Sequence, residues 1–374
     1  MRPALRKGLK IAGIVFNALA AIFTIMAAYG GAVNPETSAV PQLLALSFPL
    51  WVILTLLLLI LNLIYWRKAA IIQGATILIC LGPLWGLCPL NLFNTRITPE
   101  NQNRSFTLMT YNVYGFTDYR DGSWKTVPEG PAKFTPTLSY VLQQHDSIVF
   151  FQEVCGKIKH NSPEFIDEQV DSIHALYPYS LFYDLRSGAL SHFPFKPLEN
   201  KDSGIPDLSG NFQAMVAEIQ GHRTLLVNVH LESNMLTQED KDVFHQLTNG
   251  EKTSMTDVRT HLLRKLKKGS LLRVKEAQRV RQLIDSAGIE NVIVAGDFND
   301  VVDSHPMRII AGDDFKSAFS KAGFGPVITY HAWRFWFHID HVLYRGDMEA
   351  VDFKVDHFGR SDHYPVEVTF LWNK

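Results

Sequence analysis

The chain is organised around the stretch Val292-Ile-Val-Ala-Gly-Asp297-Phe-Asn299-Asp300. Its four apolar residues, most of them β-branched, predict a buried strand bounded by Gly296. A carboxylate and a carboxamide follow at once, two residues apart, and such oxygen ligands suit a hard cation or a phosphate. A single Gly-Asp-x-Asn is equally compatible with an Asx turn, so its interpretation depends on the rest of the chain.

An apolar strand followed by a polar residue recurs in three earlier segments, 108–112, 148–153 and 225–230. Near the C-terminus the order reverses, because Asp340 precedes the apolar run 342–344 and Asp362-His363 precedes the run 365–370. Strands that end in polar residues and strands that begin with them can run antiparallel. We therefore expect all six segments to meet at one rim of the fold.

This six-part pattern resembles the endonuclease/exonuclease/phosphatase superfamily, which includes pancreatic deoxyribonuclease, apurinic endonucleases, inositol polyphosphate phosphatases and neutral sphingomyelinases. The resemblance covers about residues 105–372 and closes with Gly-Arg-Ser361-Asp362-His363-Tyr-Pro365. Each motif alone is weak, but six motifs in the family's order are specific. The resemblance implies an α+β fold, a four-layered α/β sandwich in which two packed mixed β-sheets are flanked by helices.

The resemblance also implies a metal site. Glu153 matches the principal metal carboxylate of the family, Asn112 matches the neutral group beside it, and Asp362 matches a further carboxylate on the metal side. Such an oxygen-only set with few carboxylates suits Mg²⁺, with Mn²⁺ as the alternative. Zinc suits it less, because Cys155 has no Cys or His partner at ligand spacing. The competing interpretation of Glu153 is a salt bridge to a nearby Lys or Arg.

Further residues match the catalytic groups of the family. Asp297 and Asn299 match the pair that orients the attacking water and holds the phosphate, and His230 matches a group that donates to the phosphate or protonates the leaving group. His363 matches the imidazole that faces the scissile phosphate. Asp340 matches the carboxylate that fixes the tautomer of His363 through a hydrogen bond.

Two points about these groups stay open from the sequence. Asp340 is also compatible with a turn cap, in which case the neighbouring His341 is the functional group. The acidic partner of His230 is not evident, and Glu218 and Glu232 are both candidates.

The first quarter of the chain differs from the rest. Although the whole chain has a net charge of −1 and 47% hydrophobic residues, the windows 11–33, 41–66 and 69–90 contain no charged residue. Each is long enough to cross a bilayer core of about 30 Å. We predict a membrane domain over 1–93 with three transmembrane helices, a polar linker over 94–104 and a catalytic domain over 105–374. Buried helices of a soluble protein are the alternative, and a signal peptide competes for the first window only.

Basic residues predict the orientation in the membrane. They flank the cytoplasmic ends of spans, and here they are Arg2, Arg6, Lys7, Lys10, Arg67 and Lys68. The N-terminus and the second loop are then cytoplasmic, and three crossings place the catalytic domain on the extracytoplasmic side. Arg96 and Arg104, after the third window, argue weakly for the reverse. The three cysteines define no disulfide framework.

Helical patterns are expected at 137–144, at 163–176 with Pro163 in its first position, and at 273–287 before Gly288. Shorter pieces are expected near 304–311 and 314–322, and 236–272 is an unusually long connection. The segment 259–281 is basic, typical of a solvated helix face, although nucleic acid or anionic lipid headgroups are alternative partners. The aromatic cluster Trp333, Phe335, Trp336 and Phe337 is typical of core packing, or of a substrate wall.

Taken together, the sequence predicts a membrane-anchored, Mg²⁺-dependent phosphoric ester hydrolase of a bacterial type, most favoured as a nuclease-like phosphodiesterase. A lipid-headgroup phosphodiesterase and a phosphomonoesterase, similar to sphingomyelinases and inositol phosphatases, are the alternatives. A non-catalytic membrane module is the least favoured. The expected partners are the membrane and a phosphate ester, either nucleic acid or a lipid headgroup. No oligomeric state follows from the sequence.

Overall fold

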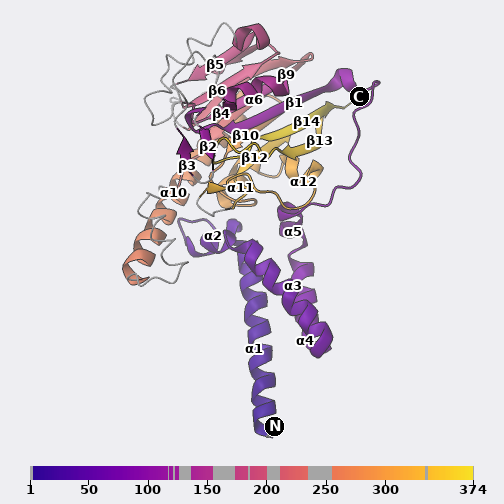
Figure 1. Ribbon diagram of the computed structural model, residues 1–374, viewed down its shortest axis with the longest axis vertical. Helices are drawn as coiled ribbons and strands as arrows, with labels where there is room; N and C mark the ends of the chain where they lie inside the picture. Colours follow the sequence, from indigo (N-terminus) through magenta and orange to yellow (C-terminus); the bar gives the residue numbers. More distant parts are fainter. Residues whose placement is uncertain are drawn as a thin grey trace.

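The computed structural model describes residues 3–116, 118–120, 123–125, 136–154, 173–183, 186–199, 211–234, 255–332 and 336–373. A β-rich part stands on a group of helices, with the N-terminus at the far end of α1 and the C-terminus beside β14 (Figure 1). The helices that we call the N-terminal helical module are α1 (Pro3–Ala28), α2 (Val40–Ala45), α3 (Phe48–Tyr65), α4 (Arg67–Ile79) and α5 (Leu81–Leu87).

Two mixed six-stranded sheets form the β-rich part. The first has the order β13-β14-β1-β4-β6-β5. Its strands are β1 (Ser105–Asn112), β4 (Ile148–Gln152), β5 (Tyr179–Tyr183), β6 (Ser187–Ser191), β13 (Met348–Val355) and β14 (Val366–Trp372). Strand β1 runs parallel to β4 and antiparallel to β14, as the reversed order of the C-terminal motif predicts.

The second sheet has the order β11-β12-β10-β9-β8-β7. Its strands are β7 (Phe195–Pro197), β8 (Phe212–Ile219), β9 (His222–His230), β10 (Asn291–Asp297), β11 (Lys316–Ser317) and β12 (Asp340–Arg345). Strand β10, the stretch quoted first, is buried between β9 and β12 and runs parallel to β9 and antiparallel to β12. A separate ribbon pairs β2 (Asp118–Arg120) with β3 (Ser123–Lys125).

Helices cover both outer faces of the paired sheets. They are α6 (Pro136–Gln144), α10 (Met255–Ala287) and α11 (His305–Ala311), whereas α12 (Ala318–Ala322) packs into the core between the sheets beside β12 and β13. Side chains of α6 pack on the first sheet, those of α10 and α11 pack on the second, and a third apolar cluster fills the space between the sheets. This confirms the predicted four-layered α/β sandwich, since each layer buries its apolar face against the next.

Period-two alternation decides which side chains enter the space between the sheets. In β10, Ile293 and Ala295 belong to the core between the sheets, whereas Val292 and Val294 face α10. Asp297 continues the inner series. Asn112 does the same for β1, because Phe106 and Leu108 lie in the inner core. The polar residues that end these strands therefore point toward each other across the two sheets.

The three apolar windows are helical, but two of them are interrupted. The second divides into α2 and α3, and the third into α4 and α5, which are bent by 66°. Pro49 and Pro83 lack the N–H groups that would continue each helix, and this accounts for the breaks. Among the described residues, two helices are long and apolar enough to cross a membrane, or three if the bent pair counts as one span.

The described basic residues of the module gather at one end. Trp66, which separates α3 from α4, lies against Gly13 of α1, so the turn that carries Arg67 and Lys68 is level with the part of α1 around Lys10 and Gly13. That end points away from the β-rich part (Figure 1). Many large apolar side chains of α1, α3 and α4 are exposed along the helices, as is typical of lipid-facing surfaces.

The end of the module contacts the β-rich part directly. Trp85 Nε1 donates to the carbonyl of Ser320 at 2.9 Å, and Asn94 Nδ2 donates to the carbonyl of Ala322 at 2.7 Å. Arg104 Nη1 donates to the carbonyl of Trp372 at 2.6 Å. The expected linker over 94–104 is thus bound to the β-rich part at both of its ends.

The expected helix at 273–287 is the second half of a longer one, since α10 begins at Met255 and occupies much of the predicted long connection. Most of the expected helix at 163–176 lies outside the described residues. The piece expected at 314–322 is helical only in α12, and Lys316 and Ser317 instead form the edge strand β11.

The buried carboxyl of Asp146, just before β4, makes the stability of the fold depend on pH. Burial raises the pKa of Asp146 to about 7, helped by Glu367 and opposed by Thr107 and Lys354. Because the pKa of Asp146 in the folded state lies above its ordinary value, the contribution of this carboxyl to the stability of the fold is fully present at low pH. That contribution is lost as the pH rises through about 7. We expect Asp146→Asn to raise the melting temperature above pH 7, by the equivalent of about 1–4 kcal/mol. An equal gain at about pH 4 and pH 8 would contradict the assignment.

Candidate active site

Strand register brings the polar strand ends together. Asp297 of β10 lies opposite His230 of β9 on one side and opposite Asp340 of β12 on the other. In the first sheet, Asn112 of β1 lies opposite Gln152 of β4, and Glu153 follows. The predicted meeting of strand ends is confirmed for these five segments, and we call this edge of the sandwich the rim.

Gly296 allows the close strand pairing that places Asp297. Its φ of 144° lies in a region that side chains disfavour, and a Cβ atom there would come within 1.9 Å of the carbonyl oxygen of Val229. Any other residue would push β10 away from β9. Asp297 and His230 would then lose their register.

Glu153, Asn112 and Asp297 form a polar row between the sheets. Asn112 Nδ2 donates to Glu153 Oε1 at 3.2 Å and to Asp297 Oδ2 at 3.1 Å. Asn112 is 1% exposed and Asp297 is also 1% exposed, whereas the Glu153 side chain is 33% exposed. Glu153 therefore offers a carboxylate to solvent at the rim, and the two residues behind it are closed off.

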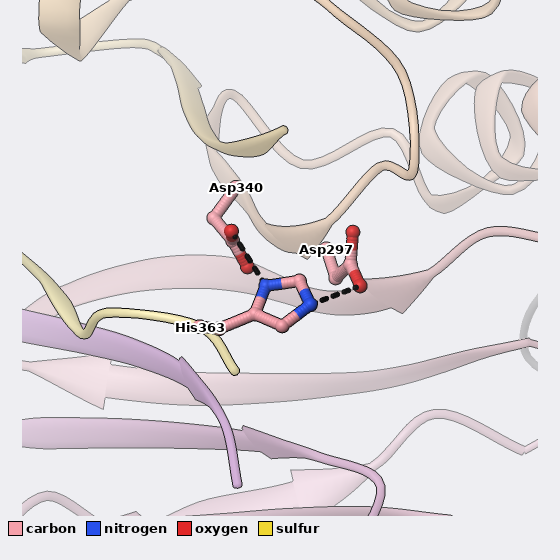
Figure 2. Close-up of side chains that lie close together, drawn as sticks. All are labelled: Asp297, Asp340 and His363. Carbon is pink, nitrogen blue, oxygen red and sulfur yellow. Dashed lines mark hydrogen bonds and ion pairs between the residues drawn. The ribbon is translucent and has the colours of Figure 1, made fainter. Parts of the chain in front are cut away.

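His363 lies between two carboxylates (Figure 2). Its Nδ1 is 2.9 Å from Asp340 Oδ2, and its Nε2 is 3.7 Å from Asp297 Oδ2. The predicted hydrogen bond between Asp340 and His363 is present. The carboxylate of Asp340 fixes the imidazole orientation, and Nε2 is the nitrogen directed at Asp297.

These contacts change the proton affinity of both groups. Burial alone would lower the pKa of His363, but Asp340 and Asp297 outweigh it and raise the pKa to about 10. Burial raises the pKa of Asp297 above its ordinary value, and His363 opposes that rise. His363 is therefore an imidazolium at neutral pH, a cation held at the rim by its two carboxylates.

His230 approaches the same row from the other side. Its Nε2 is 3.5 Å from Glu153 Oε1 and 3.8 Å from Asp297 Oδ2, and its side chain is 23% exposed. Asn299 supports Asp297 from behind, because its backbone N–H donates to Asp297 Oδ1 at 2.8 Å. The Asn299 side-chain amide also donates to the carbonyl of Leu231 at 2.9 Å, which joins the two loops that follow β9 and β10.

Backbone strain accumulates at the rim. Glu153, Asn299 and Tyr114 have φ values of 54°, 51° and 41°, in the left-handed region that non-glycine residues rarely adopt. Such residues persist where the surrounding contacts hold them, and they cluster at functional sites.

Oxygen ligands for a cation are present. One cluster of described residues, Asp297, Asp340 and His363, has potential ligand atoms within 4.8 Å of one another. Both nitrogens of His363 already face carboxylates there, so we interpret this cluster as a hydrogen-bonded unit. The Glu153 carboxylate, whose side chain is 33% exposed, is the more accessible oxygen ligand for a divalent cation. The rim carries more carboxylates than imidazoles, and this excess of negative charge favours the binding of a divalent cation.

Asp362 and His341 are the chain neighbours of His363 and Asp340. Asp362 is 8% exposed, and its Oδ1 accepts from Ser361 Oγ at 3.3 Å. Ser361 Oγ also donates to the carbonyl of Asn112 at 2.7 Å, which ties the C-terminal motif to β1. His341 faces the α10 side, with Nε2 2.9 Å from the carbonyl oxygen of Asp300, and burial lowers its pKa to about 4. The alternative with His341 as the functional group is therefore not supported.

Two residues of α10, the buried Arg273 and the partly buried Glu276, were missed as site residues. Glu276 accepts from the N–H of Glu232 at 2.7 Å, and Arg273 Nη1 donates to the carbonyl of Glu232 at 3.0 Å. Glu218 is exposed at the opposite end of β8, so it does not partner His230. Glu276 stands alone among basic residues in the sequence, and this isolation is the signal that would have found it.

The basic segment is mixed rather than uniformly solvated. Arg264, Lys267, Lys268 and Lys275 are exposed, but Arg273 is only 3% exposed. Of the aromatic cluster, Trp336 is exposed and Phe337 is half-buried and bridges to Tyr330, while Trp333 and Phe335 lie outside the described residues. Trp336 therefore does not pack in the core.

Paired imidazoles, an anionic row and a half-open carboxylate are the groups that phosphate ester cleavage requires. The reaction needs charge neutralisation on phosphate oxygens, an oriented water and a proton for the departing oxygen. The fold and the rim thus define a phosphoric ester hydrolase.

Comparison with known proteins agrees with this class. Residues 109–363 match the Endonuclease/Exonuclease/phosphatase family, and residues 9–87 match a domain of unknown function (DUF8431). Because the first match spans more than half of the 374 residues, the chain belongs to the endonuclease/exonuclease/phosphatase family. The resemblance seen in the sequence is confirmed. The comparison with curated proteins gave no match.

Similar solved structures include a humanized TDP2 of D. rerio, with 16% identity over 71% of this chain and 99% of that chain and a TM-score of 0.43. A family protein from Bacteroides thetaiotaomicron has 14% identity over 72% of this chain and 98% of that chain, with a TM-score of 0.42. SmcL has 13% identity over 71% of this chain and 99% of that chain, with a TM-score of 0.44.

Proposed function

We propose that this chain is a membrane-anchored, Mg²⁺-dependent phosphodiesterase of nuclease-like type. The observation that carries the proposal is the convergence of His230 and His363 on Asp297, with Glu153 open to solvent beside them. This arrangement supports a phosphate position surrounded by a cation-binding carboxylate, an imidazolium and a second imidazole.

The residues divide the chemistry between them. His363, held protonated by Asp340, would bind a phosphate oxygen through Nε2. Asp297 would orient the attacking water, and the half-exposed His230 would protonate the departing oxygen. Bound Mg²⁺, held by Glu153 with Asn112 and Asp362 near it, would supply charge neutralisation on the phosphate oxygens.

A substrate panel tests the proposal. The full-length protein in detergent or nanodiscs would be incubated with Mg²⁺ and with DNA, RNA, phospholipid or sugar-phosphate substrates, with Asp297→Asn as the inactive control. We expect diester cleavage that EDTA abolishes and that Mn²⁺ also supports. The full chain is needed because the N-terminal helical module contacts the β-rich part. Phosphate release from monoesters alone would overturn the assignment as a diesterase.

A lipid-headgroup phosphodiesterase is the second candidate, favoured by the position of the rim. The loop after β10 touches the N-terminal helical module, because His305 Nδ1 lies 3.1 Å from the carbonyl oxygen of Gly31. Only two residues separate Asp297 from Asp300, which also contacts the module. A site so close to the membrane end of the helices suits headgroups as well as soluble diesters. A requirement for a lipid interface, and no cleavage of DNA or RNA, would favour this candidate.

The membrane anchor is a proposal that rests on the exposed apolar helices. We assign residues 1–93 to the anchor, 94–104 to the connection and 105–374 to the catalytic domain. Lys10, Arg67 and Lys68 lie at the end of the helices away from the β-rich part, and by the positive-inside rule that end is cytoplasmic. The catalytic domain is then extracytoplasmic.

A reporter fusion tests this orientation. An alkaline phosphatase fused after Lys374 should be active, because the rule places the C-terminus outside the cytoplasm. A green fluorescent protein at the same position should be dark if exported unfolded. Moving the positive charges, with Arg67→Glu and Lys68→Glu, should lower the exported fraction. A C-terminal fusion that is active only in the cytoplasm would reverse the assignment.

A further inference from the structure

Asp300 is a buried carboxylate directly behind the rim. It lies three residues beyond Asp297 and is 2% exposed. Its Oδ2 accepts from Arg273 Nε at 3.1 Å and from Gln42 Nε2 at 3.0 Å, and its Oδ1 accepts from the N–H of Val301 at 3.0 Å. A buried carboxylate needs such donors, since each unmet one leaves a desolvation cost.

Gln42 reaches this carboxylate from the N-terminal helical module. It lies on α2, is 2% exposed, and uses both ends of its amide, because Oε1 accepts from the N–H of His305 at 3.3 Å. The Gln42 side chain therefore contacts the loop 298–304 at Asp300 and the first residue of α11 at His305. Its other neighbours on α2 are mostly apolar, so burying an amide here is explained by these partners.

Arg273 extends the same network to the other rim loop. Its Nη1 donates to the carbonyl of Glu232 and to Asn234 Oδ1, both at 3.0 Å. Glu276, one turn further along α10, accepts from the N–H of Glu232. Since Glu232 follows His230 by two residues, α10 holds the loop after β9 while Asp300 holds the loop after β10.

We propose that Gln42 is a positioning residue of the active site, which acts through Asp300 and Arg273 on the loops that carry Asp297 and His230. The N-terminal helical module then positions the catalytic loops in addition to anchoring the chain. The kinetic test of this inference rests on the proposed function, whereas the hydrogen-exchange test rests on the geometry alone.

The kinetic test compares Gln42→Met with Asn94→Ala in the full-length protein. Gln42→Met keeps the volume of the side chain and removes both hydrogen bonds. Asn94→Ala removes a hydrogen bond between the connection that follows the module and Ala322, away from the rim. We expect Gln42→Met to lower kcat roughly ten- to hundred-fold with little change in KM, because a small misplacement of reacting groups is costly. Asn94→Ala should keep the wild-type kcat.

Coupling within the network gives a further readout. Gln42→Met and Asp300→Asn should be strongly non-additive in kcat, since both remove the same contact. A purely stabilising role for Gln42 would lower the melting temperature of Gln42→Met and leave kcat per folded molecule unchanged. That result, or full additivity, would overturn the proposal.

Amide hydrogen exchange tests the positioning without any substrate. In Gln42→Met, exchange should become faster in the loops 298–304 and 231–234, and should stay unchanged at β11 and α12. In Asn94→Ala, exchange should become faster at β11 and α12 and should stay unchanged in the loops 298–304 and 231–234. If the wild-type protein cleaves no substrate but the loops respond in this way, the proposed function fails and the positioning role stands. Unchanged exchange in both loops would remove the positioning role.

Discussion

Replacing Glu153 with glutamine should lower kcat by roughly 10²–10⁴-fold in the substrate assay. The substitution keeps the shape of the side chain and removes the charge that would hold the cation. Asn112 still donates to the remaining carbonyl oxygen, so the row between the sheets should stay in place. Excess Mg²⁺ or Mn²⁺ should restore part of the activity, because the loss is one of cation affinity.

Glu290→Gln is the matched control for this change. Glu290 is exposed just before β10, at the opposite end of that strand from the rim, so it should keep wild-type activity and wild-type Mg²⁺ dependence. Calorimetric titration of Mg²⁺ into both variants gives an activity-independent measurement. Wild-type turnover of Glu153→Gln at low Mg²⁺ would show that the cation is held elsewhere, with Asp297 the next candidate.

Replacing Asp340 with asparagine should lower kcat by roughly 10²–10³-fold while KM changes little. The 2.9 Å hydrogen bond holds the His363 imidazolium in one orientation and stabilises its charge, and a neutral amide in place of the carboxylate removes that stabilisation. The double variant with His363→Ala should be no worse than His363→Ala alone, because both changes disable the same group.

The pH profile of kcat separates this role from a structural one. In the wild type, Asp340 and Asp297 raise the pKa of His363 to about 10, so activity that needs its proton should persist until the pH approaches that value. In Asp340→Asn the largest of these stabilising contacts is lost. The alkaline loss of activity should then move to lower pH. Additive effects of Asp340→Asn and His363→Ala, or an unmoved alkaline limb, would remove the pair from the mechanism.

Strand ends at the rim were predictable because a local pattern and a long-range arrangement coincide there. The apolar runs before Asn112, Glu153, His230 and Asp297 are strands, and period-two alternation sends Asn112 and Asp297 inward. Only the direction of each strand was needed to place them at one edge. The order of polar and apolar residues supplied that direction, which is reversed at Asp340 and Asp362.

Helix ends were less predictable, since single residues decide them. Pro49 and Pro83 divide windows whose apolar composition is continuous, and the boundary of α10 lies in a polar stretch without a strong signal. The role of Arg273 was also hidden. In the sequence it is one of many basic residues, and only burial against Asp300 distinguishes it from its exposed neighbours.

The class of this protein, a β-rich catalytic part of the endonuclease/exonuclease/phosphatase family after apolar helices, could be predicted from the amino-acid sequence alone. This was possible because strand periodicity, glycine positions and paired polar residues are local properties. The meeting of Gln42, Arg273 and Asp300 depends on the packing of the whole fold, because Gln42 and Asp300 are 258 positions apart in the chain and Arg273 and Asp300 are 27 apart. No local pattern encodes these contacts. They exist because a buried carboxylate must find its donors wherever the packing of the fold brings them.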